Sequence, residues 1–88
     1  MAPRFVARID VMLKPLVNDP QGLAVRDGLR TLGFEGVESV RVGKHIELTV
    51  EAAARPDAEQ AVRGMCERLL ANPVIEDFVF HVAELETV

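Results

Sequence analysis

RFVARIDVML, residues 4–13, alternates between apolar and polar side chains. Successive side chains of a strand point to opposite faces of a sheet, so this period of two predicts a half-buried strand. The apolar positions are Phe5, Ala7, Ile9, Val11 and Leu13. Val6 and Met12 lie on the other, mostly polar face, which indicates that part of that face also meets protein.

A helix is predicted to begin at Pro20. Asp19 is suited to accept a hydrogen bond from the first turn, and a proline at the first helical position loses no needed donor. Gly33 is expected to end the helix in the left-handed conformation. The helix is expected to bury the stripe formed by Val25, Leu29 and Leu32.

The middle of the chain predicts a hairpin. Its strands are residues 37–42 and 46–51, joined by the glycine-containing connection Gly43-Lys44-His45. A second helix follows, and Asp57 and Gln60 have the spacing of a capping box at its start. Its expected apolar stripe is Ala58, Val62, Met65, Cys66 and Leu69.

The last strand is expected to begin near Ile75, because Asn72-Pro73 stops the second helix. One side of this strand would carry Phe78, Phe80 and Val82. The other would carry Val79, His81, Ala83 and Leu85. Both sides are therefore partly apolar, which predicts that one of them meets another subunit.

This order of elements predicts an α+β fold of the ferredoxin-like βαββαβ class. We expect a four-stranded antiparallel sheet with two helices on one face. The 88 residues suffice for a single domain, residues 1–88.

The composition excludes several classes of function. A net charge of -4 disfavours nucleic acid as a partner, because that affinity comes from clustered Lys and Arg. Only Cys66 is present, which rules out an internal disulfide and fits a reducing, cytoplasmic setting. No apolar run approaches the roughly 20 residues of a membrane span, so no membrane contact is expected.

The sequence shows no recognisable catalytic constellation. Cys66 lies on the expected core stripe of the second helix, which favours a buried thiol over a reactive one. His45 and His81 have no evident set of companion ligands, so surface or interface positions are favoured over catalysis or metal binding. The glycines match neither a P-loop nor a dinucleotide fingerprint. We therefore expect no catalytic residue, metal site or cofactor site in this chain.

Three motifs carry a resemblance to a known family. They are NDPQG at residues 18–22, RVGKHIEL at residues 41–48 and MCERLLANPVIED at residues 65–77. Together, and in this order, they resemble PurS, the small non-catalytic subunit of phosphoribosylformylglycinamidine synthase. The resemblance covers nearly the whole chain.

The resemblance implies a role in purine biosynthesis. A PurL-type synthetase subunit would use ATP and Mg to convert formylglycinamide ribonucleotide into the amidine, with ammonia from a PurQ-type glutaminase subunit. The present chain would bridge these two partners and assist the passage of ammonia. It would also pair with itself, as a homodimer or a tetramer.

The motifs supply the candidate contact residues. Candidates for contact with the partner subunits are Asp19, Pro20, Gln21, Gly22, Arg41, Gly43, Lys44 and Glu47. The alternative for these positions is a purely structural role, as a well-capped helix and a stable hairpin. Candidates for the oligomer interface are Val6, Met12, Phe80 and Val82.

Two other functions remain open at this point. The first is a ferredoxin-like regulatory module that binds a small metabolite between paired domains. The second is an independent enzyme, which the missing catalytic constellation disfavours.

Overall fold

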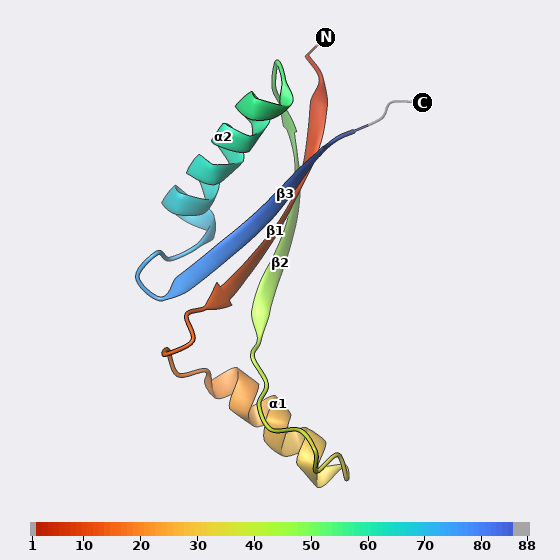
Figure 1. Cartoon of the computed structure of the whole chain (residues 1–88), viewed down its shortest axis with the longest axis vertical. Coiled ribbons are helices and arrows are strands. Elements are labelled where there is room, and N and C mark those ends of the chain that lie inside the picture. Colours follow the sequence, from red (N-terminus) through yellow and green to blue (C-terminus); the bar gives the residue numbers. More distant parts are fainter. Residues whose placement is uncertain (1, 86–88) are drawn as a thin grey trace.

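A computed structural model shows a three-stranded antiparallel sheet with two helices (Figure 1). The structure describes residues 2–85. The strands lie in the order β2-β1-β3, with β1 in the centre. The elements are β1 (Arg4–Leu13), α1 (Pro20–Thr31), β2 (Gly43–Glu51), α2 (Arg55–Met65), a π-helical turn η1 (Cys66–Leu70) and β3 (Glu76–Glu84).

The alternation predicted for residues 4–13 is confirmed. Phe5, Ala7, Ile9 and Val11 are at most 3% exposed and form the centre of the core. The register places Ile9 between Ile46 of β2 and Phe80 of β3. One face of the sheet is therefore apolar across all three strands. We call it the inner face and the opposite one the outer face.

Helix α2 covers the inner face. Ala58, Val62 and Cys66 are fully buried against the strands. Arg55 donates to the carbonyl oxygen of Val82, and the Arg63 guanidinium lies 5.1 Å from the centre of the Phe80 ring. Because α2 packs against β1 and β3, the third strand β2 receives less cover.

The π-helical turn changes the expected stripe of the second helix. Leu69 was expected in the core with Cys66, but its side chain is 83% exposed. A π turn contains more residues than an α turn, so it rotates the following side chains away from the α-helical stripe. The expected capping box is also wrong, since the helix begins at Arg55 and its N-cap, Ala54, makes no side-chain bond.

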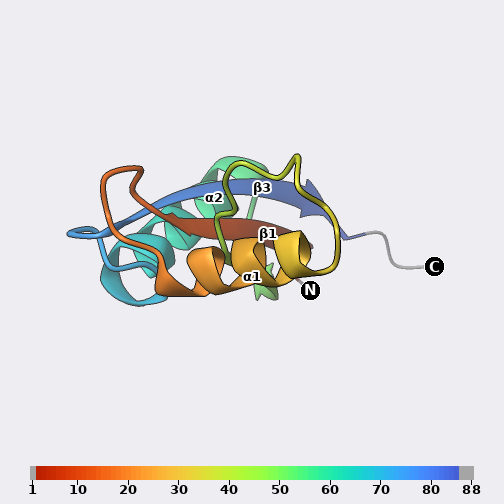
Figure 2. The ribbon, with the colours of Figure 1, turned by 90° about the horizontal axis from the view of Figure 1, so that it is seen from below.

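Helix α1 stands away from the sheet. Figure 1 shows it beyond the end of the strands, and Figure 2 shows it in front of them when the molecule is seen from below. The Cα radius of gyration is 17.1 Å, whereas a compact chain of this length would give about 12 Å. The chain therefore has an arm, residues 14–42, which leaves the sheet after β1 and returns at β2.

The expected ferredoxin-like βαββαβ fold is wrong for this chain. The sheet has three strands, the element order is β-α-β-α-β, and only α2 lies on it. Residues 37–42 are not a strand, and Gly43-Lys44-His45 is the start of β2 instead of a hairpin turn. The chain therefore runs from the arm straight into β2.

The predicted start and end of α1 are confirmed, whereas its predicted packing is wrong. It begins at Pro20 behind the N-cap Asp19, and Gly33 adopts a left-handed φ of 102°. Its expected core stripe is wrong, because Val25 is 42% exposed and Leu32 is 75% exposed. The local signals describe the helix correctly, but among residues 2–85 nothing buries Val25 or Leu32.

Candidate functional site

Asp19 fastens the two ends of the arm together. Its Oδ1 accepts a hydrogen bond from the Gly22 N–H at 2.9 Å, which caps α1. Its Oδ2 accepts from the Val42 N–H, also at 2.9 Å, where the chain re-enters the sheet. These backbone donors, together with Arg41, lower the pKa of the Asp19 carboxyl. The buried carboxylate of Asp19 thus joins the start of α1 to Val42, which lies 23 positions after Asp19.

Gly22 allows the two ends to approach each other. A Cβ at this position would come under 3.0 Å from the carbonyl oxygen of Val40, and 2.8 Å from Oδ2 of Asp19. The return segment of the arm therefore passes directly against the first turn of α1. A glycine is required here by close backbone approach and not by its φ angle.

Arg41 ties the same region to the end of β1. Its guanidinium donates to the carbonyl oxygens of Lys14 at 2.9 Å, Val17 at 3.2 Å and Leu13 at 3.3 Å. The planar fork of arginine suits several acceptors at once. We call Asp19, Gly22, Arg41 and Val42 the junction.

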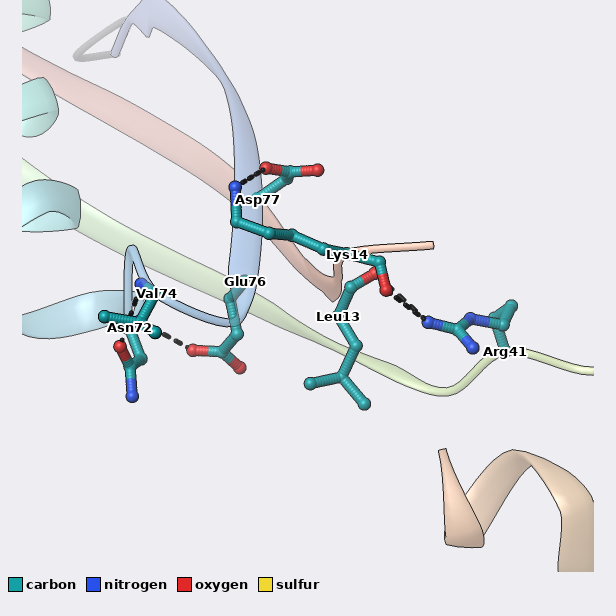
Figure 3. A network of polar contacts seen from close by, with 7 residues as sticks. All are labelled: Leu13, Lys14, Arg41, Asn72, Val74, Glu76 and Asp77. Carbon is teal, nitrogen blue, oxygen red and sulfur yellow. Dashed lines mark hydrogen bonds and ion pairs between the residues drawn. The ribbon is translucent and has the colours of Figure 1, made fainter. Parts of the chain in front are cut away.

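The junction continues into the loop before β3. Figure 3 shows Arg41, Lys14 and the Asn72–Asp77 segment in one polar network. Lys14 donates through its backbone to Ile75 and through Nζ to Asp77 Oδ1, 3.0 Å away. Glu76 accepts from the Asn72 N–H at 2.7 Å and lies 3.8 Å from the Lys44 ammonium. The base of the arm is therefore held by several independent contacts.

An exposed charge cluster lies on the outer face of the sheet. His45 Nδ1 is 2.7 Å from Asp10 Oδ1, and His45 Nε2 is 2.9 Å from Glu47 Oε2. Arg8 Nε lies 3.6 Å from the same Glu47 oxygen. Carboxylates accept only, so a protonated imidazole satisfies both contacts, and these two bonds raise the pKa of His45.

The sequence did not single out Asp10 or Arg8 as site residues. The signal was present in the spacing, because Arg8 and Asp10 alternate with core residues of β1. Placing them beside Glu47 and His45 requires the strand register, which pairs Arg8 with Glu47 and Asp10 with His45.

The structure separates the predicted partner contacts into two groups. Asp19, Gly22 and Arg41 make the junction, whereas Pro20 and Gln21 are exposed at the start of α1. Gly43 packs its backbone against the Met12 side chain, where a Cβ would clash. Lys44 and Glu47 are exposed on β2 and take part in ion pairs.

The predicted oligomer contacts also divide between two faces. Val6 and Met12 lie on the outer face, half-buried and 38% exposed, respectively. Phe80 and Val82 lie on the inner face instead. Val82 belongs to the chain's own core at 6% exposure, and Phe80 is half-buried beside Phe78.

Neither a metal-binding cluster nor an exposed thiol is found among the described residues. Residues 2–85 contain no group of three His, Cys, Asp or Glu side chains that could hold a metal ion. Cys66 is fully buried, and loss of solvation raises the pKa of its thiol, which makes it a poor nucleophile. Among the same residues, no helix has the length and apolarity to cross a membrane.

A hollow of about 380 Å³ lies at the base of the arm. Its lining includes Leu16, Leu23, Arg26 and Arg41. The Leu16 side chain is fully exposed and Leu23 is 43% exposed. The hollow is thus an open surface with apolar side chains, which differs from the enclosed pocket typical of a metabolite site.

Comparison with known proteins shows the family. Residues 6–84 match the family model "PurS: Phosphoribosylformylglycinamidine (FGAM) synthase". The chain is 49% identical over 86 residues to the phosphoribosylformylglycinamidine synthase subunit PurS of Synechocystis sp., an alignment covering 98% of this chain and 86% of that relative.

Solved structures agree with this result. PurS of Thermus thermophilus is 41% identical, with a TM-score of 0.84 and coverage of 96% of this chain and 100% of that one. A chain in the structure of PurLQS from Thermotoga maritima is 40% identical, with a TM-score of 0.81 and coverage of 94% and 99%. The present chain therefore belongs to the PurS family of phosphoribosylformylglycinamidine synthase subunits.

Proposed function

We propose that this chain bridges a PurL-type synthetase and a PurQ-type glutaminase, and assists the passage of ammonia between them. The observation that carries the proposal is the similarity to a chain in the PurLQS structure, which extends over nearly the full length of both chains. In this role the chain has no active site of its own. ATP and Mg are used by the synthetase subunit, in the cytoplasm.

The surface of the chain supports a bridging role. Large apolar side chains are exposed on the arm, including Leu16 and Phe34, and near the π-helical turn, including Leu69 and Val74. Monomeric proteins rarely expose so much apolar surface without a partner. A small chain with several exposed apolar surfaces suits the holding together of other subunits.

Ammonia transfer gives such a bridge a purpose. Ammonia that escapes into water is protonated and lost, so the path between two active sites has to exclude solvent. A well-fitted scaffold provides this exclusion without performing chemistry. We further propose that the chain acts as a homodimer, which can associate into a tetramer.

Reconstitution tests the bridge directly. The chain is mixed with its cognate synthetase and glutaminase in the presence of glutamine and Mg-ADP, and the complex is resolved by size-exclusion chromatography with light scattering. We expect one species that contains all three components. If the synthetase and glutaminase associate equally well without this chain, the bridging role is wrong.

A second measurement isolates ammonia transfer. Omitting the chain should lower glutamine-dependent synthesis of the amidine, while synthesis driven by added ammonium salt should be retained. Equal losses with both nitrogen sources would indicate a role in the synthetase reaction itself.

A further inference from the structure

Strand β3 has an edge that faces away from β1. Residues of an antiparallel pair alternate between positions bonded to the partner strand and positions whose backbone groups point away from it. The Lys14 N–H donates to the Ile75 carbonyl oxygen at one end of the β1–β3 pair, which fixes the phase of this alternation. Phe78 and Phe80 therefore direct their N–H and C=O groups toward the edge.

The edge is closed at both ends and open in the middle. Arg55 donates to the Val82 carbonyl oxygen at 2.6 Å, which occupies that acceptor. At the other end, the turn before β3 accepts the Glu76 N–H. In the part of the chain that the structure describes, the edge groups of Phe78 and Phe80 have no hydrogen-bond partner. We call these two residues the open edge.

A hollow of about 330 Å³ lies along the open edge. Its lining comes from α2, through Glu59 and Arg63, and from β3, through Phe78, Val79 and Phe80. The rings of Phe78 and Phe80 stack on the inner face, whereas Val79 lies on the outer face and is 66% exposed. Side chains from both faces of β3 line the hollow, so it follows the edge of the strand.

We propose that the open edge pairs with an extended segment of a partner subunit. This proposal rests on the bridging function proposed above and specifies one of its contacts. In strand addition, main-chain hydrogen bonds supply affinity, and pockets for alternate side chains supply specificity. The backbone groups of Phe78 and Phe80 supply the hydrogen bonds, and the hollow receives a side chain. The closed ends of the edge limit the paired segment to a few residues.

The charges beside the open edge define the chemistry of the segment. The Arg63 guanidinium lies 5.1 Å from the centre of the Phe80 ring, and it forms no ion pair with any of residues 2–85. An acidic side chain on the inner face of the segment would meet this cation. Glu59 lies one turn earlier on α2 and disfavours a second acidic side chain. The expected segment is therefore apolar with one acidic residue.

A second copy of this chain suits the open edge less well. If two β3 strands paired through Phe78 and Phe80, the two-fold axis would pass near Val79. Both Arg63 guanidinium groups would then lie on the inner face close to that axis, where like charges repel. A segment of another subunit brings no such repulsion.

Amide hydrogen exchange at single-residue resolution tests the pairing directly. In the isolated chain, the amides of Phe78 and Phe80 should exchange fast, whereas those of Val79 and His81, which face β1, should exchange slowly. The chain is then assembled with its cognate synthetase and glutaminase. We expect exchange at Phe78 and Phe80 to slow by about tenfold or more, because each amide gains a hydrogen bond.

A backbone change removes the edge donor and keeps the side chain. Cys66 allows a synthetic segment of residues 66–88 to be ligated to residues 1–65 before the full chain is folded. N-methylation of the Phe80 amide removes its N–H and blocks the approach of another strand. N-methylation of the Glu84 amide is the matched control, because it makes the same change on the same side of β3, beyond the bond from Arg55.

Binding of these chains to the synthetase and to the glutaminase is measured separately by calorimetry. We expect N-methylation at Phe80 to raise the Kd for one of the two subunits by about tenfold or more, and N-methylation at Glu84 to leave it unchanged. Arg63→Gln should raise the same Kd and make it less dependent on salt, whereas Arg68→Gln, on the exposed π-helical turn, should do neither.

The outcomes separate the two proposals. A three-component complex that forms normally with N-methylated Phe80 and shows no slowed exchange at the open edge would overturn the strand pairing and keep the bridging function. Slow exchange at Phe78 and Phe80 that grows with the concentration of the isolated chain would assign the edge to a second copy, and would overturn the pairing with another subunit. If the wild-type chain forms no three-component complex, both proposals are wrong.

Discussion

The close backbone contact at Gly22 predicts whether Gly22→Ala raises or lowers the free energy of unfolding. Alanine in the interior of a helix is normally more stable than glycine by about 0.5–1 kcal/mol. At Gly22 the added Cβ would instead come under 3.0 Å from the backbone oxygen of Val40. Relieving such an overlap requires backbone movement, which costs about 1–3 kcal/mol. We therefore expect Gly22→Ala to destabilise the protein by about 1–2 kcal/mol.

Urea denaturation measures this effect. With a slope of about 1 kcal/mol per M, the midpoint should fall by roughly 1–2 M. All variants are compared at one protomer concentration, because association contributes to the stability of a dimer. The loss is large for a domain of this size, whose free energy of unfolding is about 5–13 kcal/mol.

Two other glycines provide the controls. A Cβ at Gly28 in α1, or at Gly64 in α2, would meet nothing within 4 Å. Gly28→Ala and Gly64→Ala should therefore raise the midpoint, by about 0.5–1 kcal/mol in free energy. The reasoning would be refuted if Gly22→Ala were neutral or stabilising like its controls, because the return segment could then not lie against α1 as described.

Three further outcomes follow from the polar contacts. Arg41→Lys should lower the free energy of unfolding by about 1 kcal/mol in urea titrations, because a single ammonium cannot replace a fork that binds three carbonyls; an unchanged midpoint would contradict this. The pKa of Asp19 is lowered in the folded state, so its contribution is present above its ordinary pKa of 3.8 and is lost as the pH falls through the folded value. The stability difference between wild type and Asp19→Asn should thus shrink in acid, and a constant difference from pH 6 to pH 2 would refute this assignment. The contacts of protonated His45 with Asp10 and Glu47 raise its pKa and stabilise the fold below its ordinary pKa of 6.5. This contribution is lost as the pH rises through the pKa of His45 in the folded state. NMR titration should show the His45 pKa falling in Asp10→Asn and again in Glu47→Gln, and an unshifted pKa in both would show that neither carboxylate contacts the ring.

Local signals in the sequence were sufficient for most individual elements. The alternation of residues 4–13 describes β1, and Asp19 with Pro20 describes the start of α1. These features depend on neighbours within a few positions, which is the range over which sequence patterns are informative. None of these patterns marks the π-helical turn. An uninterrupted α-helical stripe therefore predicts a buried Leu69, whereas the structure shows it exposed.

The arrangement of the elements was not predictable in the same way. An apolar stripe on α1 indicates that the helix packs on something, but not that its partner belongs to the same chain. The bond from the Val42 N–H to Asp19 and the bonds from Arg41 to Leu13 and Lys14 span more than 20 positions. They hold residues 41–42 at the base of the arm, where the chain enters β2 directly and forms no hairpin.

The same reasoning applies to the candidate site. The motif residues 18–22 and 41–48 form a pattern in the sequence, but the pattern alone does not distinguish partner contacts from internal bonds. The structure assigns Asp19 and Arg41 to internal bonds. The outer-face cluster of Asp10, His45 and Glu47 depends on the register of β1 against β2, and the expected hairpin placed His45 in a turn instead of in β2.

The difference between motif residues that make internal bonds and motif residues that are exposed affects how mutations in the motifs are interpreted. A change at Asp19 or Arg41 would alter the direction of the arm, and assembly could then fail even though neither side chain touches a partner. A change at the exposed side chain of Gln21 leaves the junction bonds intact, so a loss of assembly there would indicate direct contact. Comparing the two kinds of variant at equal thermal stability separates the orientation of the arm from recognition by the other subunits. The exposed positions are therefore the informative ones for mapping the synthetase and glutaminase surfaces.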